Sequence, residues 1–180
     1  MRTVFLVRHG HCEGSGTLLG QRDVPLTEAG AAQADALAAF LAARLAQAEA
    51  AQVEVIVSSD LLRAVSTAEI LSRRTGAPVV FDSRLREISY GVWDGLTWAE
   101  IEDLDPEAAK RKLEDWRGST PSGGEAFEKF EARVNEARAS LLKRTERAMA
   151  VVAHLGVNAV LSGRPDLAQE YGTAIEMTLR

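Results

Sequence analysis

Five short runs rich in apolar residues are spaced along the chain, and most end at polar or glycine residues. They cover Val4–Val7, Val53–Val57, Pro78–Phe81, Met149–Ala153 and Ala174–Leu179. The run at Val4–Val7 is continuously apolar, as is typical of a strand covered on both faces of a sheet. The pattern therefore predicts five strands.

Longer segments with helical periodicity separate these strands. One helix is expected to begin at Thr27, which can cap it, and to run through an alanine-rich stretch to about Ala50. Its apolar face is drawn from Leu37, Phe40, Leu41, Arg44 and Leu45. Two more helices are predicted at about 61–75 and 125–145. Ser59 or Asp60 could cap the first of these, and Gly76 is placed to end it.

Alternation of strands and helices predicts an α/β fold with three layers, α/β/α, and a mainly parallel central sheet. Residues 1–180 are expected to form one domain, with extra helical material at about 96–124 that could act as a lid. Thr97 and Glu100 form a potential capping box, and Pro106 suits the first turn of a second short helix.

Composition narrows the possible partners. Of the 180 residues, 46% are hydrophobic and 26% are charged, which is ordinary for a globular protein and argues against disorder. A formal net charge of -5 disfavours nucleic acid and anionic membranes as partners. The first residues lack a signal-peptide pattern, and no stretch approaches the ~20 apolar residues of a membrane span. A cytoplasmic monomer or homodimer is expected, with the lone Cys12 unable to form an intrachain disulfide.

Chemistry-bearing residues follow the predicted strands. Ligands of open α/β sheets lie beyond the carboxyl ends of the strands. The residues expected there are Arg8, His9, Ser58, Ser59, Arg63, Glu87 and His154. Arginine pairs with phosphate oxygens and keeps its charge, whereas histidine can act as a neutral nucleophile. A carboxyl group beside a phosphate dianion is pushed towards its protonated form, as a general acid requires. The set predicts phosphoryl transfer through a covalent histidine.

Six motifs in a fixed order carry a resemblance to a known family. They are Arg8-His9-Gly10, the segment 20–34, Ser58-Ser59-Asp60-Leu61-Leu62-Arg63-Ala64, the segment 85–95, Pro121-Ser122-Gly123-Gly124-Glu125 and the segment 151–157. Together they resemble the histidine phosphatase superfamily, the phosphoglycerate mutase-like group. Within it, Gly20–Leu26 and Gly156-Val157-Asn158 are most similar to the alpha-ribazole phosphatase-like branch. Each motif alone is a weak signal, but six in order are a strong one.

That resemblance implies a metal-independent and cofactor-independent phosphatase acting on a small-molecule phosphate ester, with alpha-ribazole phosphate one candidate. It implies that His9 becomes phosphorylated, that Glu87 exchanges protons with the leaving group and water, and that His154 assists. Phosphate would be held by Arg8 and Arg63 together with His154. The substrate would also lie near Ser15, Gln21 and Leu155. Ser15 or Thr17 could replace an asparagine that the family often has after Arg-His-Gly.

Other readings of the same residues remain open. Asp82, Asp94 and Glu100 are alternatives to Glu87 as the acid, and His154 could be a core histidine. His9 and His11 could also indicate a metal site, but His154 is the one further histidine in the sequence, which makes a metal site unfavourable. Cys12 lacks an arginine six residues later, and neither dinucleotide nor phosphate-loop motifs are complete. A non-catalytic phosphate-binding module and a phosphoglycerate mutase-type phosphotransferase are the alternative functions.

Overall fold

A central five-stranded sheet organises the molecule. The structure, a computed structural model, describes residues 2–47 and 52–179. The strands lie in the order β3-β2-β4-β1-β5, with parallel pairing throughout except for β5, which runs antiparallel to β1. This confirms the predicted mainly parallel sheet. The strands are β1 (Arg2–Arg8), β2 (Val55–Ser58), β3 (Val79–Phe81), β4 (Ala148–Ala153) and β5 (Ala174–Leu179).

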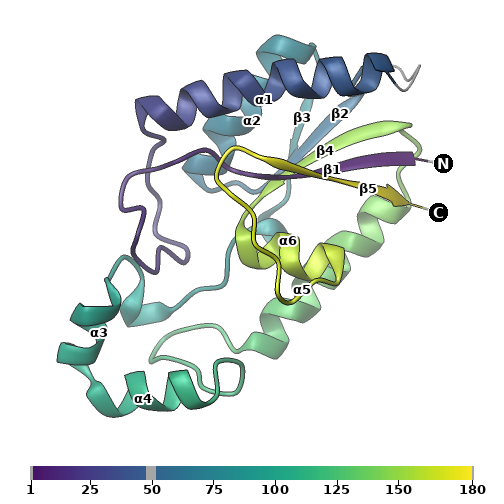
Figure 1. Cartoon of the computed structure of the whole chain (residues 1–180). Coiled ribbons are helices and arrows are strands. Elements are labelled where there is room, and N and C mark those ends of the chain that lie inside the picture. Colours follow the sequence, from purple (N-terminus) through teal and green to yellow (C-terminus); the bar gives the residue numbers. More distant parts are fainter. Residues whose placement is uncertain (1, 48–51, 180) are drawn as a thin grey trace.

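Helices cover both faces of this sheet, as Figure 1 shows. Helices α1 (Glu28–Gln47) and α2 (Leu62–Thr75) lie on one face, and α5 (Phe127–Leu142) and α6 (Leu155–Ser162) lie on the other. Successive residues of a strand point to opposite faces, so β1 divides its side chains between two cores. Phe5 and Val7 pack with the α1 and α2 layer, whereas Val4 and Leu6 pack with α5 and α6. The predicted three-layer architecture is confirmed.

The start of α1 follows its sequence signal, and one detail of its apolar face differs. Thr27 Oγ1 accepts a hydrogen bond from the Gly30 amide at 3.1 Å, as a cap should. Helix α1 is described as far as Gln47, and the rest of its predicted range, to Ala50, lies outside the described residues. Phe40 was expected on the apolar face, but its side chain is exposed (54%), and the face that packs on the sheet is formed by Leu37, Leu41 and Leu45.

The start of α2 is capped from another part of the chain. Ser59 or Asp60 was expected to cap this helix, but Leu61 occupies the cap position and its side chain makes no cap bond. Instead Asp23 Oδ1 accepts a hydrogen bond from the Leu62 amide at 2.6 Å. Gly76 ends the helix in the left-handed conformation (φ 76°), as predicted.

The segment between β3 and α5 extends beyond the sheet (Figure 1). It contains two 3-10 turns, Ser83–Leu85 and Gly91–Trp93, and helices α3 (Trp98–Leu104) and α4 (Pro106–Glu114). Thr97 and Glu100 form the predicted capping box, and Asp105 caps α4 through the Ala108 amide. This segment has its own small core, centred on Trp93, Ile101 and Ala109. Within residues 2–47 and 52–179, no helix has the length and apolarity needed to cross a bilayer.

Candidate active site

Two histidines meet at the carboxyl edge of the sheet. In the parallel register of β1 and β4, Arg8 lies beside Ala153, so His9 and His154 leave the sheet together. Their ring centroids are 5.1 Å apart. The neighbouring strand β2 ends at Ser58, and Arg63 lies in the first turn of the helix that follows it. Parallel strand order therefore brings together residues that are far apart along the chain.

His9 is held in one orientation and in a neutral form. Its side chain is only 4% exposed, and Nδ1 lies 2.8 Å from the Gly10 carbonyl oxygen. Because a carbonyl oxygen only accepts hydrogen bonds, Nδ1 carries the proton and Nε2 keeps a free lone pair. Burial, with further contributions from the charges of Arg63 and Arg8, lowers the pKa of His9 to about 3. The imidazole is thus unprotonated near neutral pH.

Arg63 is buried and tied to the loop that precedes α1. Its Nη1 donates to the Arg22 carbonyl and its Nη2 donates to the Gly20 carbonyl, each at 2.7 Å. The side chain is 1% exposed, yet Nε has no hydrogen-bond partner among residues 2–47 and 52–179. A buried donor without a partner is costly, so this position is suited to bind an anion.

Arg8 is held in a different way. Its Nη1 donates to the Gln169 carbonyl at 2.5 Å, and its guanidinium carbon lies 3.7 Å from the centroid of the Tyr171 ring. The buried Nε of Arg8 also lacks a partner within the part of the chain that the structure describes. Two permanent positive charges therefore lie close enough to act on His9.

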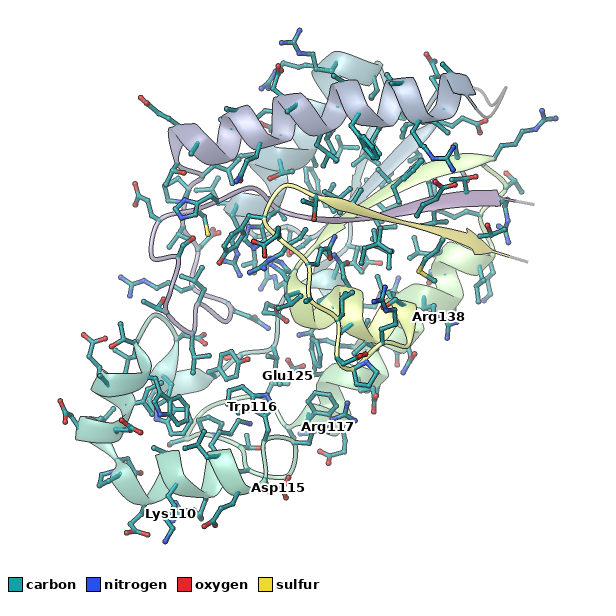
Figure 2. All side chains as sticks on the ribbon, viewed as in Figure 1. Lys110, Asp115, Trp116, Arg117, Glu125 and Arg138 are labelled. Carbon is teal, nitrogen blue, oxygen red and sulfur yellow. The ribbon has the colours of Figure 1, made fainter. Side chains whose placement is uncertain are left out.

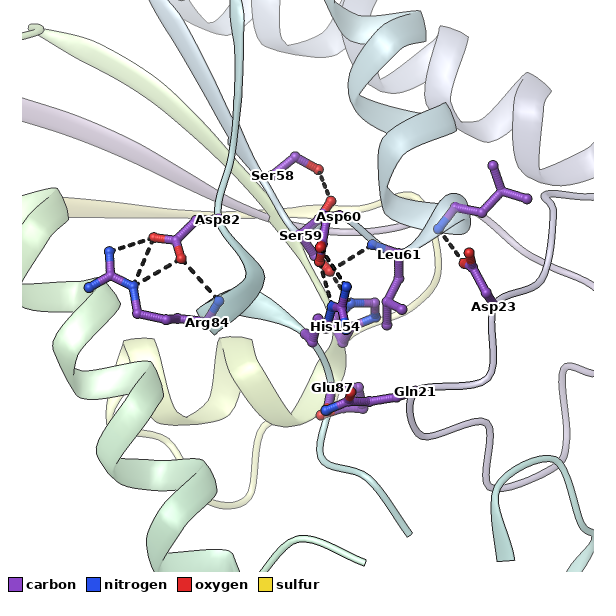
Figure 3. Close-up of polar contacts among 12 residues, drawn as sticks. Gln21, Asp23, Ser58, Ser59, Asp60, Leu61, Asp82, Arg84, Glu87 and His154 are labelled. Atoms are coloured by element: carbon purple, nitrogen blue, oxygen red, sulfur yellow. Dashed lines mark hydrogen bonds and ion pairs between the residues drawn. The ribbon is translucent and has the colours of Figure 1, made fainter. Parts of the chain in front are cut away.

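His154 forms the start of α6 and is buried against β2. Its Nε2 lies 3.0 Å from the Ser59 hydroxyl, a contact drawn in Figure 3. Its Nδ1 is buried and has no partner among the described residues. Burial, followed by the charge of Arg63, holds the pKa of His154 well below the usual range for histidine. One ring nitrogen is accordingly left for a ligand.

Glu87 is fixed by backbone amides on both carboxyl oxygens. Oε1 accepts from the Ile88 amide and Oε2 accepts from the Gly156 amide, each at 3.1 Å. Burial raises the pKa of this carboxyl despite those two bonds and the charge of Arg63. A Cβ on Gly156 would lie 2.5 Å from Oε1, so glycine is needed at this position to admit the carboxyl group.

The backbone of Glu87 is clamped as well. Its carbonyl oxygen accepts from Gln21 Nε2 at 3.1 Å and from Arg133 Nη2 at 2.9 Å. Arg133 also donates to the carbonyls of Arg84 and Arg86 and pairs with Glu125 at 2.7 Å. The clamp holds the segment that carries Glu87 against α5.

The alternative acids are engaged elsewhere. Asp82 pairs with Arg84 at 2.7 Å, and Glu100 completes the capping box of α3. Asp94 accepts hydrogen bonds from the Tyr90 amide at 2.7 Å and from the Gln21 amide at 3.2 Å. Glu87 is thus the member of this group whose carboxyl contacts the first turn of α6, beside His154.

Three predicted substrate-binding residues, Ser15, Gln21 and Leu155, make no side-chain hydrogen bond to His9, Arg63 or His154 among the described residues. The Ser15 hydroxyl donates to the Cys12 carbonyl at 2.7 Å and so closes a turn within its own loop. The Gln21 side chain contacts the Glu87 backbone, and Leu155 lines a neighbouring cavity. Thr17 also bonds within its loop, to the Gly14 carbonyl at 2.8 Å.

Tyr171 and Arg133 were missed by sequence reasoning. The Tyr171 ring lies 5.5 Å from that of His9 as well as over Arg8. Its only sequence signal is a bulky aromatic residue just ahead of the last strand. Arg133 resembles any other charged residue of an amphipathic helix, so its contact with the Glu87 segment had no signal in the pattern.

A cavity of about 500 Å³ adjoins Glu87 on the side of α6. Its walls come from α5, α6, the loop after α6 and the segment after α4. They are formed by Glu87, Ile88, Tyr90, Lys112, Trp116, Arg117, Phe127, Phe130, Glu131, Leu155, Gly156, Ala159, Val160, Gly163, Pro165 and Leu167. His9, His154 and Arg63, which we call the histidine cluster, lie outside this lining. The cavity and the histidine cluster therefore meet at Glu87.

Known proteins resemble this chain in sequence and in fold. The chain is 37% identical over 155 residues to a bifunctional protein of Mycobacterium tuberculosis. The aligned region covers 84% of this chain and 41% of that relative. The chain therefore spans about two fifths of the length of that relative. A mycobacterial glucosyl-3-phosphoglycerate phosphatase has a similar structure, with a TM-score of 0.82 and 33% identity over 99% of this chain and 90% of its own.

The alpha-ribazole phosphatase of Shigella flexneri shares the fold, with a TM-score of 0.85 and 24% identity over 99% of this chain and 91% of its own. The family model for the histidine phosphatase superfamily (branch 1) matches residues 4–166. That range includes the strand ends and the helix starts that carry His9, Arg63, Glu87 and His154. The chain belongs to the histidine phosphatase superfamily, branch 1.

Proposed function

We propose that the chain hydrolyses phosphomonoesters of a small metabolite through a phosphohistidine on His9, without a metal. The observation that carries this proposal is the neutral, buried His9 ring, fixed through the Gly10 carbonyl and lying 5.1 Å from the ring of His154. The nearby charges of Arg63 and Arg8 favour an anion beside that ring. Membership of a superfamily that includes named phosphatases supports the same reaction.

In the first step, Nε2 of His9 attacks phosphorus and the bond from phosphorus to the ester oxygen breaks. The departing oxygen takes the proton of Glu87, whose pKa is raised by burial, and leaves as an alcohol. Arg8, Arg63 and His154 hold the phosphoryl oxygens through the transfer. The buried Nε atoms of both arginines and Nδ1 of His154 are donor or acceptor positions free for this role.

In the second step, the Glu87 carboxylate removes a proton from water, whose oxygen attacks the phosphorus. The bond between nitrogen and phosphorus breaks, inorganic phosphate forms, and both His9 and Glu87 return to their starting protonation states. The charge of the transferring group is balanced by the two guanidinium groups, which is the role that metal ions take in other phosphoryl-transfer sites.

Phosphohistidine is acid-labile and base-stable, so trapping it tests the proposal directly. Incubation with a radiolabelled phosphoryl donor and rapid quenching should label the wild type and the His11→Ala variant. The His9→Ala variant should carry no label. His11 is the matched control, because it lies two residues away and its Nδ1 contacts Thr27 Oγ1 at 3.0 Å. Retained label in His9→Ala would exclude His9 as the nucleophile.

A substrate panel should be run with and without chelator. Alpha-ribazole phosphate and glucosyl-3-phosphoglycerate belong in it, because relatives of similar structure carry those substrates in their names. Activity should survive the chelator and should be inhibited by vanadate. Loss of activity with chelator and its return with added metal would contradict the metal-independent mechanism.

A further inference from the structure

We propose that the cavity beside Glu87 binds the leaving alcohol and makes the site selective for monoesters of apolar alcohols that carry an aromatic or branched aliphatic group. This inference rests on the proposed function and adds a substrate class to it. The histidine cluster is suited to the phosphoryl group, which all monoesters share. Discrimination between substrates must therefore come from contacts with the remainder of the ester.

Glu87 connects the phosphoryl position with the cavity. The general acid must lie within hydrogen-bond reach of the leaving oxygen, so the alcohol attached to that oxygen begins at Glu87. The carboxyl of Glu87 contacts the Gly156 amide, and both residues form part of the cavity wall. Because the histidines and Arg63 lie outside that wall, the alcohol would extend from Glu87 away from the phosphoryl group and into the cavity.

The wall is mainly apolar. Its aromatic residues are Tyr90, Trp116, Phe127 and Phe130, and its aliphatic residues are Ile88, Leu155, Ala159, Val160, Pro165 and Leu167. A volume of about 500 Å³ is within the range of small-molecule sites. Burying one aromatic ring against such a wall is worth about ten- to a hundredfold in binding.

The charged groups of the wall already interact with other groups of the protein. Lys112 directs its ammonium to the backbone carbonyls of Trp116 and Ser119, the latter at 2.6 Å. The Arg117 guanidinium lies 4.5 Å from the centroid of the Phe127 ring, and Glu131 adds a negative charge to the same cavity. An anionic leaving group gains little from this arrangement, because Lys112 is bound to two backbone carbonyls and Glu131 offsets the charge of Arg117.

Of the aromatic residues of the wall, Trp116 lies in the segment that links α4 to α5, whereas Phe127 and Phe130 lie in α5 itself. Figure 2 shows Trp116 and Arg117 on this segment, facing the space between α4 and α5. The Trp116 ring packs near Trp98 and Tyr90, with centroids 6.3 Å and 6.4 Å away. Packing with α3 thus holds the side chain that would cover the leaving group.

The test compares two esters of aliphatic alcohols with similar leaving ability. Benzyl phosphate places an apolar ring in the cavity, whereas glycerol 3-phosphate places hydroxyl groups there. We expect kcat/KM to be at least about tenfold higher for benzyl phosphate, with most of the difference in KM. Equal or reversed efficiency would overturn the proposal.

Variants locate the selectivity. Ala159→Phe fills the cavity from α6, and Ala132→Phe places the same side chain on the exposed surface of α5 as a control. Trp116→Ala opens the wall, with Leu113→Ala as an exposed control on α4. The ratio of kcat/KM for the two esters should fall to near unity in Ala159→Phe and by about fivefold or more in Trp116→Ala. Both controls should keep the wild-type ratio.

The outcomes separate this inference from the proposed function. Phosphohistidine on His9 together with an unchanged ratio in both cavity variants would overturn the leaving-group assignment alone. Absence of label on His9 would overturn the proposed function instead. If Ala159→Phe fails to fold, Trp116→Ala decides the question, because its side chain is partly exposed (43%) and its removal puts no extra volume into the interior.

Discussion

The guanidinium of Arg8 lies over the ring of Tyr171, with 3.7 Å between the guanidinium carbon and the ring centroid. Arg8 ends β1, and Tyr171 lies just before β5, which pairs with β1 in the antiparallel direction. Closing the sheet with its last strand therefore places an aromatic face against a cation at the candidate site. Cation–π contacts of this kind contribute about 2 kcal/mol where they are desolvated.

Replacing Tyr171 should weaken phosphate binding through Arg8. In Tyr171→Leu, the loss of 1–2 kcal/mol corresponds to a rise of about five- to thirtyfold in KM, with a smaller change in kcat. Tyr171→Phe keeps the aromatic face and should stay within about twofold of the wild type. Steady-state kinetics and inhibition by inorganic phosphate measure both variants. Equal effects of the two substitutions would assign the role to the hydroxyl group instead.

Acid should destabilise the fold through His9. The folded-state pKa of His9 is about 3, below the ordinary 6.5 of the unfolded chain, so its contribution to stability is present above pH 6.5 and is lost as pH falls towards 3. Between pH 7 and pH 5 this loss amounts to about 2 kcal/mol. The side chain of His9→Asn cannot titrate, so the variant should lose correspondingly less unfolding free energy between these pH values. Urea unfolding at pH 7 and pH 5 would measure the difference. An identical pH dependence in the variant would contradict the assignment.

The pH dependence of kcat should reveal Glu87 as the acid. Burial raises the pKa of this carboxyl, so its protonated form persists to higher pH than usual and is lost as pH rises through the shifted value. The wild type should therefore show a falling basic limb in kcat with alkyl phosphates. Glu87→Gln should lower kcat by about 10²–10⁴-fold and remove that limb. A limb that survives in the variant would move the acid to another group.

Arg133 should position Glu87 as well as stabilise the fold. Arg133→Met leaves Glu125 without its partner and the carbonyls of Arg84 and Arg86 without a donor, while Glu87 keeps only Gln21, which predicts a loss of about 3 kcal/mol in unfolding free energy. The same change at Arg138, an exposed residue of α5 labelled in Figure 2, is the matched control and should cost under 0.5 kcal/mol.

The kinetic effect of Arg133→Met distinguishes positioning from stability alone. Its kcat should fall more for alkyl phosphates, whose leaving oxygen needs a proton, than for 4-nitrophenyl phosphate, whose leaving group does not. Measurements belong at a temperature where both variants are folded. A uniform reduction across these esters would indicate that Arg133 acts only on stability.

The order of strands and helices was readable from the sequence, because apolar runs and helix caps are local signals. The same signals placed His9, Arg63 and His154 at strand ends and in a helix start, and parallel pairing then required them to converge. The choice of Glu87 over Asp82, Asp94 and Glu100 rested on the resemblance and not on any local pattern.

Only the tertiary structure separated those acids, since the difference lies in the partners that each carboxyl meets. Asp82 meets a nearby arginine, whereas Glu87 meets the amide of Gly156, which lies 69 positions away. Tyr171 over Arg8, Asp23 at the start of α2 and Arg133 behind Glu87 are likewise contacts between distant segments. Their geometry depends on how the loops pack, and the periodicity of a chain carries no record of that packing.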